Sequence, residues 1–476
     1  MASVFGRFFS VSRMVKPEDV AGEIPSSRIV YHDLSRIAVP SVIEMVFMSL
    51  IGSVDTVMIG NLGYEAIAAV GLVGQPRMLM LSLFFALNIG VTAVVARRKG
   101  EGRKEEANHA LRNAMLVIMA LSVVVTAASL AWSQTLIKLA GAKEDTLNMA
   151  VQYFRIMSYF LPASALTMCI NAAQRGAGNT RITLMVNLTA NIVNVIFNYL
   201  LIYGHFGFPR LEVEGAAWAS GIGICVGLAL CIASLFVKKF SDGFLRLSLK
   251  DDWRLRKNTL GSIMKVGGNA MVEQGALRIG FFAYAAIVAN LGTEAFAAHQ
   301  VGMQFLSLSF TFGDGLAVAG TSLVGQMLGQ KRPDMASIYS KCCQRLALCA
   351  SIAIASTVAI LRFQLAGIFL DASNPSSLEP FLLAADIMLM VALFQPVQMQ
   401  SVVTSGCLRG AGDNLYVAMI MIICVVVIRP ILSCIAIFAF GFGLFGAWSA
   451  SLVDMTIRMS LMYRRFNSNV WQTKKV

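Results

Sequence analysis

The sequence predicts an all-α membrane protein with twelve transmembrane helices arranged as two related six-helix bundles. Of its 476 residues, 57% are hydrophobic and 14% are charged, which leaves too few polar side chains to cover a water-soluble globule of this size. Apolar stretches of about 20 residues or more recur between short charged segments, and each can cross roughly 30 Å of hydrocarbon. In addition, the second half of the chain repeats the first.

Twelve apolar stretches qualify as helices, six in each half of the chain. Short polar or charged connections separate them. In chain order, helices are expected at residues 36–59, 67–96, 112–135, 151–173, 181–203, 214–237, 262–289, 296–327, 343–370, 380–406, 415–440 and 442–463.

The repeat is visible as an ungapped self-alignment. Asn61–Ala107 lies over Asn290–Ala336 at one constant offset, so that NLGYEAIAAVG falls on NLGTEAFAAHQ. The same offset aligns Glu44 with Glu273, which gives each copy one acid at the same depth of its first helix. The chain is therefore expected to be a tandem duplication of one membrane module.

A second repeated motif supports the duplication. RGAGNT at Arg175–Thr180 recurs as RGAGDN at Arg409–Asn414, and each motif follows a span that contains a proline, Pro162 or Pro396. The glycines suit a tight turn, and the arginine can cap a helix end or bind phosphate.

The longest polar connection between spans marks the expected boundary between the two bundles. Because six spans is an even number, both copies start on the same side of the membrane, as parallel repeats about a pseudo-two-fold axis along its normal. The expected domains are an N-terminal tail (1–31), an N-lobe (32–237), a linker (238–261), a C-lobe (262–463) and a C-terminal tail (464–476).

The net charge of +13 comes from lysines and arginines concentrated in both tails, the linker and the loop after the second span. The alternate loops contain few, so the positive-inside rule places both termini in the cytoplasm of a multi-pass protein of the cytoplasmic membrane. Topology and anionic lipids account for this charge, and we expect no nucleic-acid partner. We expect a monomer in contact with membrane lipids.

Catalytic constellations are absent from the sequence. The four histidines, His32, His109, His205 and His299, are scattered, and neither a phosphate-binding loop nor a CxxC motif occurs. The nine cysteines fall within spans or at a helix end, where they act as small apolar residues. We therefore expect no enzymatic activity and no cofactor.

Four carboxylates lie within or near the ends of apolar spans, at Glu44, Asp55, Glu273 and Asp314. An unpaired charge there costs several kcal/mol, so each acid should line a wet cavity, hold a cation or bind a proton. Glu44 and Asp55 are eleven residues apart and so share one helix face. The alternative for Asp55 is simple hydration at a helix end.

The fifth span has a stripe of four asparagines on one face. Asn187, Asn191, Asn194 and Asn198 recur at helical spacing, and four amides would be unfavourable against lipid. With Asp55, Asn194 and Asn198 form a candidate Na⁺ site, or a hydrogen-bond network that sets the proton affinity of the acid. The alternative is interhelical hydrogen bonding without an ion.

The second half has a different polar set. Arg278 lies about 140° around the helix from Glu273, so its pairing is expected across helices. Asp386 and Asp454 are interpreted as isolated. The candidates for a substrate cavity are Gln300, Gln304, Asp314, Gln398 and Arg278.

Several segments resemble the multidrug and toxic compound extrusion (MATE) family of the MOP flippase superfamily. They are the two RGAG turns, VDTVMIGNLG at Val54–Gly63, FAAHQVGMQF at Phe296–Phe305, and NIVNVIFNYLLIYG followed by VEGAAWAS within Asn191–Ser220. The resemblance implies two six-helix bundles forming a V around a central cavity. It also implies efflux of lipophilic, often cationic compounds in exchange for Na⁺ or H⁺.

The resemblance assigns roles to individual residues. Asp55 matches the acid proposed to accept the coupling cation or proton, Asn194 and Asn198 match its partners, and Glu273 matches a cation-binding glutamate. Asn198 and Gln398 stand where some members have aspartate, which removes a charge from each lobe, and Glu44 is an additional acid. We expect an antiporter that works by alternating access; the alternative is a lipid-linked oligosaccharide flippase, which would need more cationic residues to hold a diphosphate.

Overall fold

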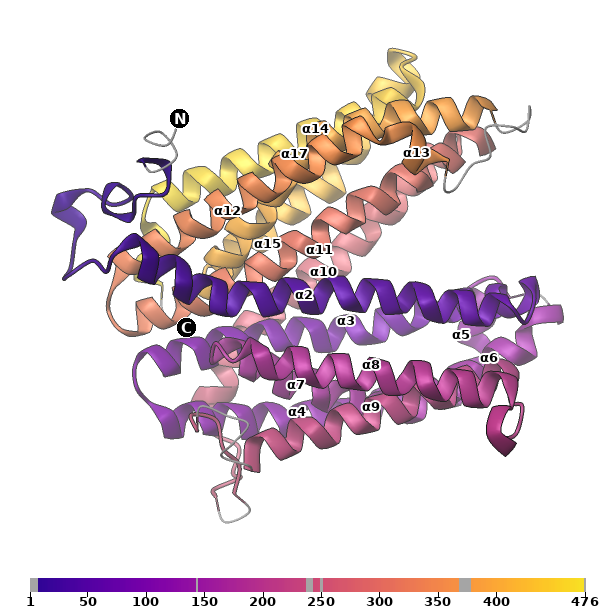
Figure 1. The fold of residues 1–476 in the computed structure, drawn as a ribbon, viewed down its shortest axis with the longest axis horizontal. Helices are drawn as coiled ribbons and strands as arrows, with labels where there is room; N and C mark the ends of the chain where they lie inside the picture. Colours follow the sequence, from indigo (N-terminus) through magenta and orange to yellow (C-terminus); the bar gives the residue numbers. More distant parts are fainter. Residues whose placement is uncertain (1–6, 143, 237–242, 249–250, 368–377, 475–476) are drawn as a thin grey trace. The chain divides into compact units, whose positions relative to one another are not determined.

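The computed structural model describes residues 7–142, 144–236, 243–248, 251–367 and 378–474, and within these ranges the regular elements are helices (Figure 1). The first copy comprises α2 (Ser27–Gly60), α3 (Tyr64–Gly100), α4 (Lys104–Ala131), α5 (Ser133–Leu139), α6 (Glu144–Tyr159), α7 (Leu161–Gly176), α8 (Thr180–Tyr203) and α9 (Glu212–Phe236). The second comprises α10 (Lys257–Ala289), α11 (Thr293–Gly329), α12 (Pro333–Ile360), α13 (Arg362–Ala366), α14 (Leu378–Gly410), α15 (Asn414–Ile422), α16 (Arg429–Cys434) and α17 (Gly443–Asn467).

Short helices complete the chain. Two π-helical segments, η4 (Ile423–Ile428) and η5 (Ile435–Ala439), flank α16. Single 3₁₀ turns occur at η1 (Val11–Arg13), η2 (Pro17–Asp19), η3 (His205–Gly207) and η6 (Val470–Thr473).

The all-α membrane fold is confirmed, but the exact count of twelve spans is not. Among the described residues, nine helices are long and apolar enough to cross a membrane. A tenth span results if α6 and α7, which meet at a 49° bend, are counted together. Large apolar side chains stay exposed along these helices, for example Val57, Phe282 and Leu393 at 66%, 78% and 63%, as a lipid-facing surface requires.

The duplication is expressed in the lengths of the helices. α3 and α11 both have 37 residues, and α4 and α12 both have 28, at the offset of the sequence repeat. Gly63 and Gly292 precede α3 and α11 with positive φ angles of 121° and 102°, which glycine adopts without a steric penalty. Equivalent sequences therefore form equivalent local structures.

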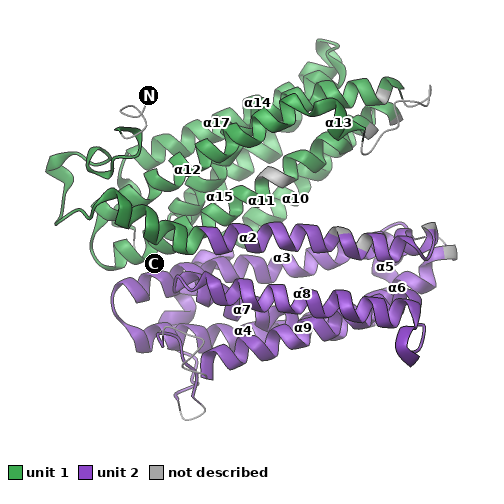
Figure 2. Cartoon of the chain, in the orientation of Figure 1, with its two compact units in different colours: residues 1–38, 269–476 green, residues 39–268 purple. Residues whose placement is uncertain are grey.

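The chain divides into two compact units (Figure 2). One contains residues 1–38 and 269–476 and the other residues 39–268, so the divisions fall inside α2 and α10 rather than in the linker. The lobe limits expected from the sequence stay a prediction, and the limit at 237/238 lies outside the described residues, as do residues 1–6 and 475–476.

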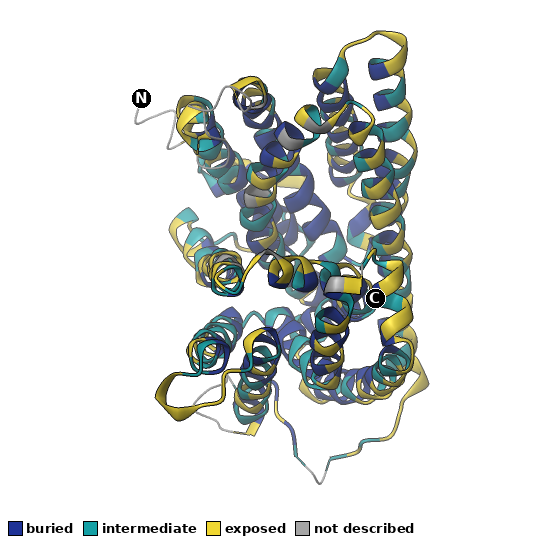
Figure 3. Cartoon of the chain, turned by 90° about the vertical axis from the view of Figure 1, so that its right-hand side faces the viewer, coloured by how far each residue is buried: buried dark blue, intermediate teal, exposed yellow. Residues whose placement is uncertain are grey.

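Each unit has its own apolar core, and buried residues line helix faces that turn toward neighbouring helices (Figure 3). In residues 39–268 the core centres on Ile137, Phe154 and Ile202. In the other unit it centres on Phe394 and Trp448.

The two RGAG motifs make the tight turns that their glycines predict. Gly178 and Gly412 have φ angles of 77° and 91°. The first glycine of each motif has a different role, because a Cβ on Gly176 or Gly410 would lie 2.5 or 2.3 Å from the carbonyl oxygen of Thr92 or Thr321. These glycines therefore let α7 approach α3, and α14 approach α11, at backbone distance.

The two threonines strengthen these crossings. Thr92 Oγ1 donates to the Ala172 carbonyl at 3.0 Å, and Thr321 Oγ1 donates to the Gly406 carbonyl at 2.8 Å. The prolines before the motifs differ in effect: Pro162 lies at the start of α7, just after the bend, whereas Pro396 lies inside the continuous α14.

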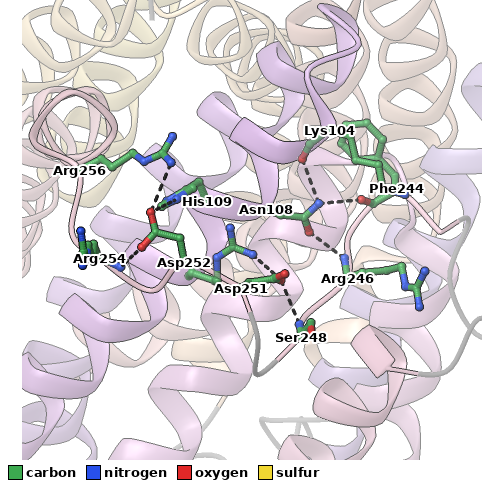
Figure 4. Close-up of polar contacts among 11 residues, drawn as sticks. Lys104, Asn108, His109, Phe244, Arg246, Ser248, Asp251, Asp252, Arg254 and Arg256 are labelled. Carbon is green, nitrogen blue, oxygen red and sulfur yellow. Dashed lines mark hydrogen bonds and ion pairs between the residues drawn. The ribbon is translucent and has the colours of Figure 1, made fainter.

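The linker between the copies is fastened to α4 (Figure 4). Asn108 donates to the Phe244 carbonyl at 3.1 Å and accepts from the Arg246 backbone N–H at 2.7 Å. The buried Arg112 donates to Asp251 at 2.6 Å. Hydrogen bonds from Arg254 and Arg256 lower the pKa of Asp252, so this carboxylate stays ionised at neutral pH.

We predict that Gly176→Ala and Gly410→Ala each destabilise the protein by about 1–3 kcal/mol, because the added Cβ forces two helices apart. Thermal unfolding in detergent measures the effect. The matched control is Gly74→Ala in α3, where a Cβ would have no neighbour within 4 Å. Equal stability of all three variants would contradict the close-packing role.

Candidate functional site

The candidate site lies along the contact between α2 and α8. Both helices run in the same direction, and side chains link them at three levels. At the level nearest the start of α2, called the inner level, Glu44 accepts hydrogen bonds from Thr183 and Asn187. At the middle level, Asp55 accepts hydrogen bonds from Asn194 and Asn198. At the third level, Tyr203 donates a hydrogen bond to the backbone at the end of α2. Glu44 and Asp55 are eleven positions apart, as are Asn187 and Asn198, so the helices keep one register.

Asp55 forms the middle level. Asn198 Nδ2 donates to Asp55 Oδ1 at 2.7 Å. Asn194 Nδ2 lies 2.9 Å from Oδ1 and 3.2 Å from Oδ2 in the amide orientation that matches donors with acceptors, and its oxygen then faces Ser220 of α9. Both asparagines are buried and Asp55 is half-buried. The structure thus brings together the three residues that the sequence placed in one site.

Three further features bear on what this site can do. The amide N–H groups of both asparagines stabilise the negative charge of Asp55. Asn198 Oδ1 is buried without a hydrogen-bond partner among the described residues, so one amide oxygen beside the carboxylate can still accept a hydrogen bond or coordinate a cation. Arg77 of α3 acts electrostatically on Asp55 and lines a cavity of about 20 Å³, which has room for one water molecule.

Glu44 forms the inner level and is almost fully buried, at 1% exposure. Its Oε1 accepts hydrogen bonds from Arg175 and, at 2.7 Å, from Asn187 Nδ2. Its Oε2 accepts from Thr183 Oγ1 at 2.7 Å. The arginine of the first RGAG motif is therefore the counter-ion of Glu44, and not a helix cap or a phosphate ligand.

Tyr203 at the end of α8 and Asn191 within the asparagine stripe make the remaining polar contacts of this face. Tyr203 OH donates to the Met58 carbonyl at 2.9 Å and accepts from Asn61 Nδ2 at 3.1 Å. Asn191, between the two acid levels, donates to the Asn187 carbonyl of its own helix at 2.7 Å. The stripe thus serves three acceptors, and only its last two members reach Asp55.

The second copy repeats the ion pair. Arg409 of the second RGAG motif donates to Glu273, which is 1% exposed. The carboxylate therefore pairs across helices with α14 and not with Arg278 on its own helix, which is exposed. Because Arg458 also acts electrostatically on Glu273, this acid lies near two arginines.

The second copy does not repeat the Asp55 site. The repeat offset places Tyr284 at the position of Asp55, and the guanidinium of Arg429 lies 5.6 Å from the Tyr284 ring centre. Arg429 donates to Asp454 Oδ2 at 2.9 and 2.6 Å, and Arg458 lies 3.9 Å from the same oxygen. The interpretation of Asp454 as isolated was wrong, since it is the buried partner of two arginines. Asp386 lies 3.4 Å from Arg362 and was not isolated either.

The residues expected around a substrate cavity in the second copy differ in burial, and among the described residues no hydrogen bond or ion pair joins them to one another. Gln300, Gln304 and Asp314 are exposed on α11, and Arg409 acts electrostatically on Asp314. Gln398 is buried, and within the described residues its amide has no hydrogen-bond partner. Whether these residues bind substrate stays a prediction.

The sequence did not reveal which acids the arginines of the apolar spans and of the RGAG motifs pair with. Arg175, Arg409 and Arg429 each neutralise a buried acid, at Glu44, Glu273 and Asp454. A signal was present for the first two, because the repeated arginine and the repeated glutamate occur once in each copy.

A duplicated helical bundle with charged and amide side chains bonded between its membrane helices defines a multi-pass membrane transport protein. The sequence profile of the MatE family matches residues 40–200 and 270–435. The chain belongs to this family, whose members are transporters and not enzymes.

Similarity to individual relatives extends over nearly the whole chain. The chain is 27% identical to "Probable multidrug resistance protein NorM" of Thermotoga maritima, over 95% of both chains. It is also 27% identical to "Multidrug resistance protein PmpM" of Pseudomonas aeruginosa, over 82% of this chain and 80% of that protein.

Solved structures show the same fold. The chain is similar to a structure described as the outward-facing conformation of a multidrug resistance MATE family transporter of the MOP superfamily, with a TM-score of 0.83 and 21% identity. That similarity covers 92% of this chain and 96% of the other. A MATE crystal structure in the bent conformation is similar with a TM-score of 0.82, at the same identity and coverage.

We predict that Asp454→Asn destabilises the unit that contains residues 269–476 by about 3–5 kcal/mol, because it leaves two buried arginines without their carboxylate. The yield of monodisperse protein and its melting temperature in detergent measure the loss. Asp386→Asn, whose carboxylate is half-exposed beside Arg362, serves as the control. A melting temperature that falls no further for Asp454→Asn than for the control would argue against the buried cluster.

Proposed function

We propose that this protein is a multidrug efflux antiporter that exports lipophilic, often cationic compounds in exchange for Na⁺ or H⁺ by alternating access. The observation that carries the proposal is the contact of Asp55 with Asn194 and Asn198 between α2 and α8. The names of the relatives NorM and PmpM support multidrug resistance as the function class.

The coupling role belongs to Asp55 because of how the other buried acids are neutralised. Glu44, Glu273 and Asp454 each form an ion pair with an arginine, and a cation that approached such a pair would meet no net negative charge. Asp55 instead accepts hydrogen bonds from neutral amides. Among the described residues, Arg77 acts on it electrostatically but forms no ion pair with it, so the charge of Asp55 remains available to a proton or a metal cation.

The two candidate ions would use this site differently. A proton needs only the carboxylate, whose charge the amide donors stabilise before protonation. Na⁺ needs several oxygen ligands, and the carboxylate together with the uncommitted Asn198 oxygen would supply the first of them. Either ion would neutralise Asp55 and weaken the bonds between α2 and α8, which supports a link between ion binding and a change of conformation.

The charge distribution supports the setting of this function. Basic tails and a basic linker favour a protein of the cytoplasmic membrane with both termini in the cytoplasm. The proposal also takes the protein to work as a monomer without a cofactor. The flippase alternative is less favoured. It would need cationic residues to hold a diphosphate, and of the candidates Arg278 and Arg429, Arg429 is buried and already paired with Asp454.

We predict that Asp55→Asn abolishes gradient-driven efflux, because asparagine carries no charge to receive the ion. Asn198→Ala should lower the apparent affinity for the coupling ion, since it removes a direct partner of Asp55. Uptake of ethidium or norfloxacin into inverted vesicles, which corresponds to efflux from the cell, measures both effects under separate Na⁺ and proton gradients and identifies the ion.

Asp386→Asn is the control for the loss of one carboxylate elsewhere in the chain and should retain efflux. If Asp55→Asn transports against a gradient as well as the unaltered protein, the coupling role of Asp55 is rejected.

A further inference from the structure

We propose that Glu44 and Arg175 form a fixed lock that positions Asp55 against Asn194 and Asn198, and that Glu44 carries no ion itself. This inference rests on the proposed function of Asp55. It assigns to Glu44 and Arg175 a positioning role in ion binding that is separate from the site they support.

The first argument is the number of partners that Glu44 has. Its two oxygens accept three hydrogen bonds, from Arg175, Asn187 and Thr183, and the side chain is 1% exposed. Arg175 balances the charge of Glu44 and is the only cation among these three partners. The Arg175 side chain is 23% exposed. A carboxylate held in this way is a structural anchor, because accepting a proton or a metal ion would break an existing ion pair.

The second argument is geometric. Glu44 and Asp55 lie on one face of α2, about 16 Å apart along the helix axis, and their partners on α8 have the same separation. In two parallel helices, a bond at the inner level sets both the rotation and the axial register at the middle level. A displacement of α2 along its axis by one residue would move Asp55 by about 1.5 Å, which is enough to break its hydrogen bonds to the side-chain amides of Asn194 and Asn198.

The third argument is that the lock extends to two other helices. Asn171 of α7 donates to Asn187 Oδ1 at 3.2 Å, and Cys231 of α9 donates to Asn171 Oδ1 at 3.3 Å. Asn187, the α8 partner of Glu44, is thus itself held by α7, which also carries Arg175. The inner level is therefore anchored to the bundle and can act as the reference point for α2.

The second copy supports the division of roles. It retains the ion pair of Glu273 with Arg409, but counting from its RGAG motif places Val417 and Met421 where the first copy has Thr183 and Asn187. The copy that lacks an acid at the Asp55 level thus also lacks the hydroxyl and amide that complete the lock. The polar partners of Glu44 occur together with the site they position.

The central test combines Glu44→Gln with Arg175→Gln. Arg175→Gln alone leaves a buried carboxylate unpaired and should reduce the yield of folded protein, whereas the double variant removes both charges and should restore it. We expect the double variant to need at least about tenfold more coupling ion for half-maximal efflux, with little change in the maximal rate, as is typical when partners of an ion ligand are removed. Arg175→Lys, which keeps the charge, should recover most of the affinity.

A second variant keeps the test decisive if the double variant does not fold. Thr183→Val removes one bond to Glu44 and leaves the ion pair in place, and it should raise the half-saturating ion concentration by a smaller factor. Thr189→Val removes an exposed hydroxyl from the same helix and should leave that concentration unchanged.

The outcomes separate this inference from the proposed function. If Asp55→Asn is inactive while the double variant and Thr183→Val have unaltered ion affinity, the lock is rejected and the function stands. If the double variant folds but cannot build a gradient at any ion concentration, Glu44 is a coupling acid and the lock is again rejected. If Asp55→Asn retains coupled efflux, the proposed function fails first.

Discussion

A buried ion pair between the first helix of each copy and the RGAG turn is the interaction on which the rest of the structure depends. Glu44 pairs with Arg175, and Glu273 pairs with Arg409. A carboxylate in an apolar helix is strongly unfavourable without a counter-ion, so the first helix of each copy must pack where its fourth span ends. The glycine after each arginine serves the same junction, because it lets that span approach the second helix at backbone distance.

From this common base the two copies diverge in chemistry. In the first copy, α8 continues the contact with α2 through the asparagine amides that donate to Asp55 and through Tyr203. No arginine pairs with Asp55 in the part of the chain that the structure describes. In the second copy the equivalent level holds Tyr284 and the Arg429–Asp454 pair, beside π-helical turns in the same span. Under the proposed function, the first copy would receive the cation while the second copy holds its arginines and acid in a fixed pair, which is a physical basis for unequal roles of the two bundles.

Under the proposed function, the arrangement relates ion binding to helix movement. Three levels of hydrogen bonds join α2 to α8, and only the middle one centres on an acid bonded by neutral groups. Neutralising that acid weakens one level while the inner ion pair remains. Helix packing against such a fixed point allows a small local change to shift a whole span, because packed bundles move between discrete arrangements.

The sequence by itself determined the fold class, the duplication with its register, and the placing of Glu44 and Asp55 on one helix face and of the four asparagines on another. Hydrophobic length and periodicity carry that information, since they state which residues share a helix face. Only the tertiary structure decided which face meets which: that Arg175 neutralises Glu44, that Asp454 holds Arg429, that Asn191 turns to its own helix, and that Gln300 and Gln304 are exposed. The physical reason is that pairing between helices depends on their relative rotation, depth and crossing, which are set by the packing of the whole bundle and not by the spacing of residues along one helix.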